Sequence, residues 1–271
     1  MCRHGDRTPT SLYPNDPNSP SDFPEGLGHI THKGKNDQYN LGKYLRTKYE
    51  DFLTYDSNEM RARSSGRERC LESIQTNLYG LYPPRDAKVW NSEVDWQPVP
   101  IQTMPVDLDG MLYEDAICPA DDEELERIRE SPEGAEVMSN NANLMRTLEQ
   151  LSGKKMTDWV SVRDLLDTLT IEHDVLIAAF TSAFGVFNQL AVPSSTAVIT
   201  ELHEDADGNF YIQMLFKNDT TRKPYRLEIP GCEGFRCNLK TFKAIAKPYV
   251  VEDWRQECGL EPLPGGTNLF P

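Results

Sequence analysis

The residues best suited to chemistry lie at the start of the chain, in Arg3-His4-Gly5-Asp6-Arg7. The imidazole of His4 is a nucleophile and a base that operates near neutral pH. Arg3 and Arg7 flank it, and a planar guanidinium matches a pair of phosphate oxygens. Gly5 lets the backbone approach a ligand closely. The pattern indicates a histidine nucleophile inside an anion clamp. For an isolated Arg-His-Gly triplet, a solvated basic terminus is the alternative.

The longer stretch from Arg3 to Pro9 resembles a family signature. It matches the R-H-G-x-R-x-P motif of the histidine acid phosphatases, a branch of the histidine phosphatase superfamily. Later segments are similar to the same family, among them Gly26-Leu27-Gly28, Trp96 to Pro100 and Asp253 to Gly259. The resemblance therefore extends over nearly all of the chain.

A second segment, Arg63 to Ser73, is similar to the family's R-S-S-D-x-D-R-T-x-x-S pattern. The last arginine of that pattern, a phosphate ligand in the family, corresponds to Arg69. The segment departs from the pattern at three positions: Gly66 and Glu68 replace aspartates, and Cys70 replaces a threonine.

A third segment contains His173-Asp174, followed by an apolar stretch at residues 175–188. A lone His-Asp pair is a weak signal. The residues that follow it resemble the helix after the family's second motif, A-H-D. The resemblance therefore makes His173 a second phosphate-binding histidine and Asp174 the proton donor.

The family resemblance implies a reaction: hydrolysis of phosphate monoesters through a phosphohistidine, with no metal or other cofactor. It assigns the attack on phosphorus to His4 and protonation of the leaving alcohol to Asp174. It assigns binding of the non-bridging phosphate oxygens to Arg3, Arg7, Arg69 and His173. An unperturbed aspartic acid titrates near ~3.9, which agrees with an acidic working range.

Two helices are predicted next to the first two motifs. Thr31 is a typical N-cap, and apolar residues recur at helical spacing from Tyr39 to Leu53. The second helix carries Arg69 and ends before Pro83-Pro84, because proline cannot continue a helix.

Residues 119–172 have a helical pattern, which the resemblance identifies as a cap over the active site. Acidic residues at 121–124 are placed favourably at the start of a helix. Ser131-Pro132 opens a second helix with Gly153 as its stop, and Thr157 can cap a third.

The last third of the chain is predicted to be rich in β-structure. Residues 197–203 and 210–216 are apolar or alternating, and Asp205 to Asn209 between them is a hairpin signal.

The expected fold class is α/β: a three-layer α/β/α sandwich of the histidine phosphatase type with a reduced helical cap. The phosphatase core is assigned to residues 1–104 and 173–264, and the cap remnant to 105–172. Residues 265–271 are rich in proline and glycine and are expected to form a mobile tail.

One or two central strands of this sandwich are expected to be missing. Only Met1 and Cys2 precede Arg3, so neither the family's strand before the first motif nor a signal peptide is expected in this chain. The chain also passes from the cap directly to His173, where Leu169 to Glu172 could imitate a strand. Central strands are buried on both faces, so their loss would weaken the scaffold.

The six cysteines are Cys2, Cys70, Cys118, Cys232, Cys237 and Cys258. Their spacing fits neither a zinc ribbon nor a redox C-x-x-C pair. The resemblance implies two disulfides, Cys118–Cys258 and Cys232–Cys237. Cys2 and Cys70 remain, and burial as small apolar residues is favoured over a role as oxidisable thiols beside arginines.

Composition bounds the class of protein and its partners. Hydrophobic residues make up 38% and charged residues 26%, as in globular proteins. A net charge of −15 argues against nucleic acid and anionic membranes as partners, and no apolar run has the length of a membrane span. Asn218-Asp219-Thr220 is an N-glycosylation pattern, and the resemblance implies a secreted or lysosomal location.

The resemblance favours an acid phosphatase acting on small phosphate monoesters or phosphoprotein side chains, with a homodimer among the assemblies it allows. The alternative is a catalytically impaired product that lacks scaffold strands and at most binds phosphate. Phytases share the opening motif, but residues 90–105 and 197–260 look closer to the lysosomal, prostatic and venom-type enzymes. The R-x-P extension disfavours a mutase-like transferase.

Trp159 is either a core residue or, as the resemblance implies, close to the leaving group of the substrate.

Overall fold

The computed structural model describes residues 1–113, 116–170 and 175–261. The chain divides into two compact units. Unit 1 consists of residues 1–8, 28–104 and 172–249, and unit 2 consists of residues 9–27, 105–171 and 250–271.

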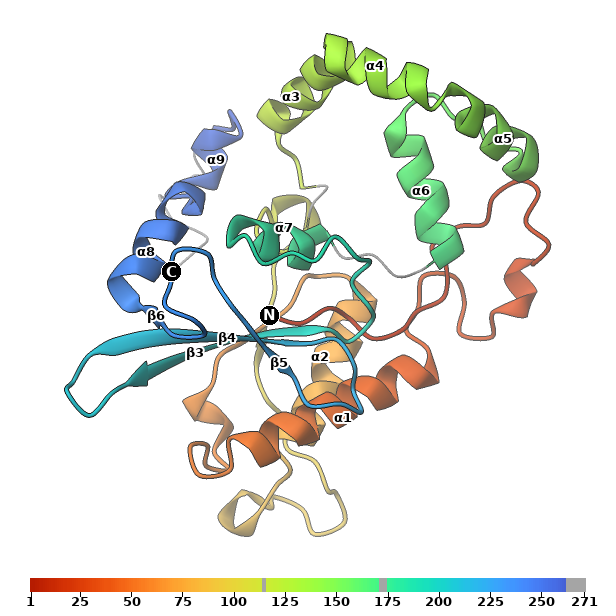
Figure 1. Cartoon of the computed structure of the whole chain (residues 1–271). Helices are drawn as coiled ribbons and strands as arrows, with labels where there is room; N and C mark the ends of the chain where they lie inside the picture. The colour runs from red at the N-terminus through yellow and green to blue at the C-terminus, as the bar shows by residue number, and fades with distance from the viewer. Residues whose placement is uncertain (114–115, 171–174, 262–271) are drawn as a thin grey trace. The chain divides into compact units, whose positions relative to one another are not determined.

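Unit 1 contains the two helices predicted next to the first motifs (Figure 1). Helix α1 spans His32–Lys48, and the Thr31 side chain accepts a hydrogen bond from the Gly34 amide, which confirms the predicted N-cap. Helix α2 spans Glu68–Leu81, and only its C-cap residue, Tyr82, separates it from the proline pair, as expected. Both helices are therefore bounded by local signals that the sequence displays.

The two helices pack with their backbones in close contact. A Cβ atom added to Gly42 of α1 would lie 2.0 Å from the Asn77 carbonyl oxygen of α2. A Cβ atom added to Gly80 of α2 would lie 2.3 Å from the Tyr39 carbonyl oxygen of α1. Because a Cβ atom would overlap a carbonyl oxygen at both positions, glycine is required there for the backbones of α1 and α2 to pack directly against each other.

A β-hairpin of two eight-residue strands makes up most of the main sheet in unit 1. Strands β3 (Ala197–Glu204) and β4 (Phe210–Lys217) pair antiparallel, with Ala197 opposite Lys217 and Glu204 opposite Phe210. This confirms the predicted hairpin. Strands β5 (Tyr225–Leu227) and β6 (Cys237–Asn238) both pair with β4. A separate pair of parallel strands consists of β1 (Ala62–Arg63) and β2 (Ile101–Gln102).

Helices cover both faces of this sheet, so unit 1 has three layers (Figure 1). On one face, Lys48 and Tyr49 at the end of α1 contact Glu201 of β3. On the other face, α7 (Val175–Ala183) and α8 (Leu239–Ala246) pack on β3 and β4 around a buried core. The buried members of that core are Ile177, Phe184, Val192, Val198, Ile212, Met214, Phe216, Leu227, Ile229 and Cys237.

Unit 2 is helical in the part of the chain that the structure describes. Its helices are α3 (Pro119–Glu130), α4 (Pro132–Asn140), α5 (Ala142–Ser152), α6 (Trp159–Thr170) and α9 (Trp254–Glu257). The Cys118–Cys258 disulfide joins the start of α3 to the end of α9. Short 3-10 helices cover Pro20–Asp22 and Val106–Leu108 in unit 2. In unit 1 they cover Ser57–Glu59, Asp86–Lys88 and Lys247–Tyr249.

Three details of the predicted cap are corrected. The helix from Ser131 to Gly153 is interrupted at Asn141, which ends α4 and precedes α5. Helix α6 begins at Trp159, and Asp158 rather than Thr157 accepts the bond from an amide of its first turn. The suggestion that a strand-like segment begins at Leu169 is wrong, because Leu169 lies in α6. The helical pattern of that helix continues to Thr170.

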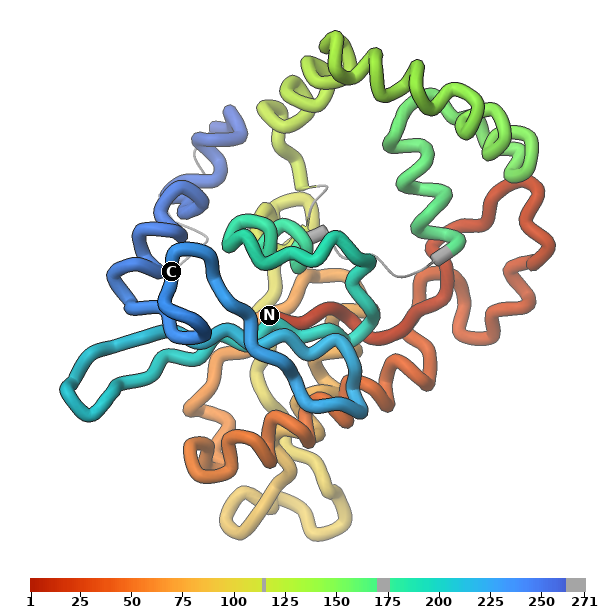
Figure 2. Tube along the Cα trace, viewed as in Figure 1, coloured from red at the N-terminus to blue at the C-terminus, as the bar shows by residue number. Residues whose placement is uncertain are grey.

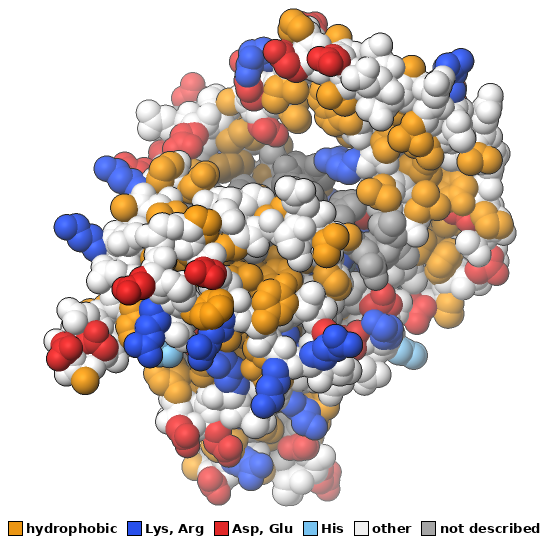
Figure 3. Space-filling view, viewed as in Figure 1, with side chains coloured by type: hydrophobic (Ala, Val, Ile, Leu, Met, Phe, Trp, Pro, Cys, Tyr) orange, Lys and Arg blue, Asp and Glu red, His pale blue; other side chains and the backbone are white. Residues whose placement is uncertain are grey.

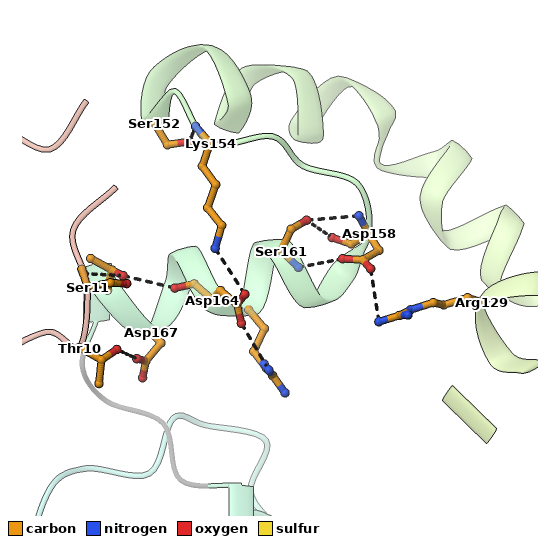
Figure 4. A network of polar contacts seen from close by, with 11 residues as sticks. Thr10, Ser11, Arg129, Ser152, Lys154, Asp158, Ser161, Asp164 and Asp167 are labelled. Carbon is orange, nitrogen blue, oxygen red and sulfur yellow. Dashed lines mark hydrogen bonds and ion pairs between the residues drawn. The ribbon is translucent and has the colours of Figure 1, made fainter. Parts of the chain in front are cut away.

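A polar network fixes α6 within unit 2 (Figure 4). Lys154 pairs with Asp164 at 3.3 Å, and Arg129 of α3 pairs with Asp158 at 3.4 Å. Thr10 donates to Asp167 at the other end of the helix. Beneath these contacts lies a small core of Met145, Met156 and Leu165.

The cap helices also expose large apolar side chains, several of them visible over α4 to α6 in Figure 3. Val137 is 50% exposed, Leu144 52% and Leu151 70%, at a spacing of seven residues along α4 and α5. Such exposure agrees with the small size of the core in unit 2. Among the described residues, no helix is both long and apolar enough to cross a lipid bilayer.

Candidate active site

The first motif is attached to the main sheet through its backbone. Cys2 forms a bridge with Ala197 at the start of β3, and the N-terminal end of the chain runs next to the strands of the hairpin (Figure 2). The Arg3 amide donates to the Thr196 carbonyl at 2.9 Å, and the Ser195 amide donates to the His4 carbonyl at 3.0 Å. Arg3 and His4 are therefore held against residues 195–197, which lie nearly 200 positions later in the chain.

The next residues lie directly on helix α1. A Cβ atom added to Gly5 would be 2.5 Å from the Gly34 carbonyl oxygen. One added to Gly34 would be 2.2 Å from the Asp6 carbonyl oxygen. The Thr31 amide donates to the same Asp6 carbonyl at 2.9 Å. The turn after His4 is thus seated on the N-terminus of α1, and glycines on both sides allow the contact.

Helix α2 brings Arg69 to this turn. The Ser73 hydroxyl donates to the Arg69 carbonyl at 2.6 Å and accepts a hydrogen bond from the Gly5 amide at 3.0 Å. Ser73 is 4% exposed, so solvent does not compete with these bonds. One hydroxyl thereby ties the helix that carries Arg69 to the peptide that follows His4.

His4 lies in a positively charged and desolvated position. Burial lowers the pKa of its imidazole to about 3, and the charges of Arg3, Arg69 and Arg7 act in the same direction. The contact between Nδ1 and the Gly5 carbonyl, at 2.7 Å, only partly opposes this decrease in pKa. The three arginines predicted to bind phosphate thus all lower the pKa of the same histidine.

The same contact defines which nitrogen of His4 can react. A carbonyl oxygen only accepts hydrogen bonds, so Nδ1 of the neutral ring must carry the proton. The lone pair is then on Nε2. The arrangement provides a neutral imidazole nucleophile, oriented through its backbone neighbour and surrounded by cations.

The flanking arginines are themselves buried. Arg3 is 2% exposed and donates through Nη1 to the Val192 carbonyl. Arg7 is 5% exposed and donates through Nη1 to the Thr8 carbonyl at 3.0 Å. Two guanidinium groups, whose planar forks match pairs of phosphate oxygens, are therefore buried close to His4.

Two of the predicted site residues, His173 and Asp174, lie outside the described residues. Trp159 is half-buried at the start of α6. Asn218 is exposed directly after β4, where its side chain is accessible.

The structure contains both disulfides that the resemblance implied, Cys118–Cys258 and Cys232–Cys237. Burial is the favoured prediction for Cys2 and Cys70. It is wrong for Cys2, which is exposed, whereas Cys70 is partly buried. The short backbone bridge at Cys2 explains this, because it attaches the main chain to β3 without covering the side chain.

Sequence reasoning did not identify Gln38 or Ser195, which contact the backbone of the first motif. A signal for Gln38 existed: it lies on the same helical face as the buried residues Leu41 and Gly42. A polar side chain at a buried position of an amphipathic helix must find a polar partner. Ser195 offered no comparable signal.

Within residues 1–113, 116–170 and 175–261, no group of three or more His, Cys, Asp or Glu side chains is arranged to hold a metal ion.

Two acid phosphatases are similar to this chain along its whole length. Human lysosomal acid phosphatase is 28% identical over 345 aligned positions, which cover all of this chain and 81% of the relative. Bovine prostatic acid phosphatase is 27% identical over 346 positions, covering all of this chain and 89% of the relative. Because the chain has 271 residues, both relatives contain internal segments that it lacks.

The fold has a solved counterpart in the phytase from Citrobacter braakii. That structure superimposes with a TM-score of 0.60 and 15% identity, and it covers 95% of this chain and 97% of the phytase. The model for the histidine phosphatase superfamily (branch 2) matches residues 1–172, which include Arg3, His4, Arg7 and Arg69. This protein belongs to the histidine phosphatase superfamily, branch 2.

Proposed function

We propose that this protein is an acid phosphatase that hydrolyses phosphate monoesters through a phosphohistidine at His4. One observation carries the proposal: a neutral imidazole, with Nδ1 committed to the Gly5 carbonyl, lies within the field of three arginines. The names of the acid phosphatase relatives support the same reaction class. The catalytically impaired alternative has no comparable support.

In the proposed reaction, Nε2 of His4 attacks the phosphorus atom in line with the leaving oxygen. A bond from Nε2 to phosphorus forms while the bond to the alcohol oxygen breaks. Arg3, Arg7 and Arg69 bind the non-bridging oxygens and stabilise the charge that spreads over them in the transition state. Water then attacks the phosphohistidine and releases inorganic phosphate and free His4.

The roles of His173 and Asp174 remain proposals from the family resemblance. His173 is proposed as a further ligand of the phosphate oxygens. Asp174 is proposed to protonate the leaving alcohol and then to take a proton from the attacking water.

The lowered pKa of His4 explains why such a site could operate in acid. A histidine with an ordinary pKa of 6.5 would be almost fully protonated, and so not nucleophilic, at pH 4 to 5. With a pKa of about 3, His4 keeps its lone pair throughout that range. Burial, together with the arginines that bind phosphate, therefore keeps the nucleophile in its reactive form.

Several further assignments belong to the proposal. The substrates are small phosphate monoesters or phosphoprotein side chains, and the location is lysosomal or secreted, as the names of the relatives suggest. Residues 1–104 and 173–264 are proposed as the phosphatase core, with 105–172 as the cap remnant. A homodimer and glycosylation at Asn218 are also proposed.

The test is hydrolysis of p-nitrophenyl phosphate at pH 4.5 to 5.5 by the purified chain. Wild type is expected to turn over, and His4→Ala to be inactive while remaining folded. Arg69→Ala is expected to lose activity because a transition-state contact is removed, with exposed Arg61→Ala as the matched control. Exposed His32→Ala serves as the control for His4. A folded wild-type chain without activity would refute the proposal and favour the impaired alternative.

A further inference from the structure

A buried glutamine lies beneath the first motif. Gln38 of α1 is fully buried, with 0% of its surface exposed. Its Nε2 donates to the Arg3 carbonyl at 2.8 Å and to the Ser195 hydroxyl at 3.3 Å. Both protons of the amide group are thus used, one on each of the two segments that meet at His4.

Gln38 is fixed in turn by helix α2. The Asn77 side chain donates through Nδ2 to the main-chain carbonyl of Gln38 at 3.2 Å. The same nitrogen lies 3.5 Å from Oε1 of the Gln38 side chain. Asn77 lies one turn after Ser73, which holds the Gly5 amide. The packed helices α1 and α2 therefore hold the nucleophile peptide at two points, through Gln38 before His4 and through Ser73 after it.

The partner segment contains a strained residue. Ser195 has a φ of 60°, in the left-handed region that residues other than glycine and asparagine rarely adopt. In this conformation its amide donates to the His4 carbonyl. Backbone strain of this kind persists only where surrounding contacts enforce it, and it concentrates at functional sites. The bond from Gln38 to the Ser195 hydroxyl is one such contact.

We propose that Gln38 is a positioning residue for the nucleophile. Its side chain fixes the Arg3 carbonyl and the strained Ser195, and through them the peptide that orients the His4 ring toward phosphorus. The effect on turnover rests on the proposed function, whereas the effect on the His4 ring does not.

The chain offers a matched control for this contact. Gln97 is also buried, and its Nε2 donates to the Tyr55 and Tyr82 carbonyls, both at 3.1 Å. Those carbonyls belong to Tyr55 and Tyr82, and neither residue is part of the first motif. Gln38→Met and Gln97→Met each replace a buried amide, which makes two hydrogen bonds, with an apolar side chain of similar shape. Both variants are therefore expected to lose a comparable amount of stability.

The kinetic test compares single-turnover phosphorylation of the two variants with p-nitrophenyl phosphate. Gln38→Met is expected to slow phosphorylation about ten- to a hundred-fold, with KM little changed, because misplacement of a reacting group by about 1 Å costs rate rather than binding. Gln97→Met is expected to retain the wild-type rate. Equal rates in the two variants would overturn the proposal.

A second measurement does not depend on turnover. Imidazole nitrogen NMR of the five histidines reports the tautomer and titration of His4. Wild type and Gln97→Met are expected to show a single Nδ1–H tautomer, and Gln38→Met a mixture or a pKa closer to the ordinary value. If the wild type proves inactive, the proposed function fails, and the His4 signals still decide the role of Gln38.

A third variant covers the case in which Gln38→Met does not fold. Ser195→Gly accepts a positive φ without strain and removes the hydroxyl that Gln38 holds. It is expected to fold and to change phosphorylation and the His4 signals in the same direction as Gln38→Met. A wild-type rate and spectrum in Ser195→Gly would overturn the proposal.

Discussion

Replacement of His4 by alanine is expected to make the protein relatively more stable in acid. In the unfolded chain His4 titrates at its ordinary pKa of 6.5, whereas in the folded chain its pKa is about 3. Between these values the unfolded state binds one more proton than the folded state, so stability falls as pH decreases. The loss begins as pH falls through 6.5 and is complete near pH 3. His4→Ala has no such proton to bind and escapes this loss.

The magnitude follows from the two pKa values. One pKa unit corresponds to about 1.36 kcal/mol, and pH 4.5 lies two units below the unfolded pKa, so the wild type loses about 2–3 kcal/mol there. At pH 7.5 both states are neutral and the loss is close to zero. The difference in unfolding free energy between His4→Ala and wild type is therefore expected to shift by about 2–3 kcal/mol in favour of the variant.

The assay is urea unfolding at four pH values from 7.5 to 4.5, in buffers free of phosphate because an anion at the arginines would raise the His4 pKa. Exposed His32→Ala is the control and is expected to show no comparable shift. A difference between His4→Ala and wild type that stays constant with pH would show that the imidazole is not held neutral by burial and the arginines. The electrostatic reasoning would then be refuted.

Two further predictions concern the scaffold. Gly42→Ala is expected to destabilise the protein by about 1–3 kcal/mol in urea unfolding, because the new methyl group would overlap the Asn77 carbonyl. The control is Asn40→Ala on the exposed face of the same helix, which is expected to be nearly neutral. Equal effects of the two substitutions would contradict the close packing. Cys118→Ser opens a disulfide with a sequence separation of 140 residues and is expected to cost about 5 kcal/mol on the chain-entropy account, against about 2 kcal/mol for Cys232→Ser, whose separation is 5. Denaturation of each variant against wild type measures both costs, and a larger loss in Cys232→Ser would contradict the entropic account.

Local signals in the sequence predicted the elements that carry the motifs. Thr31, the proline pair after α2 and the Asp205 to Asn209 turn each act within a few residues, so their effect could be predicted before any tertiary contact was known. The interruption at Asn141 had no such signal. The cap of α6 lies one residue after the predicted Thr157, because Thr157 and Asp158 are both competent caps and only the backbone geometry distinguishes them.

The reactive residues were predictable, but the contacts that hold them were not. Arg3, His4 and Arg7 are adjacent in sequence, so their chemistry could be inferred from the motif alone. Gln38 and Ser195 are separated by 157 positions, and their contact depends on how α1 packs against the segment before β3. Neither a propensity nor a hydrophobic period encodes such a pairing. The left-handed backbone of Ser195 is likewise a product of its tertiary partners.

The most direct test of the central claim is to trap the covalent intermediate. The wild-type chain is mixed with a phosphate monoester that has a good leaving group, and the reaction is stopped with denaturant at high pH, where a phosphohistidine survives. Mass spectrometry of the peptides is expected to show one phosphoryl group on His4, and none in His4→Ala. A chain that turns over without phosphate on His4, or with phosphate on another residue, would contradict the account.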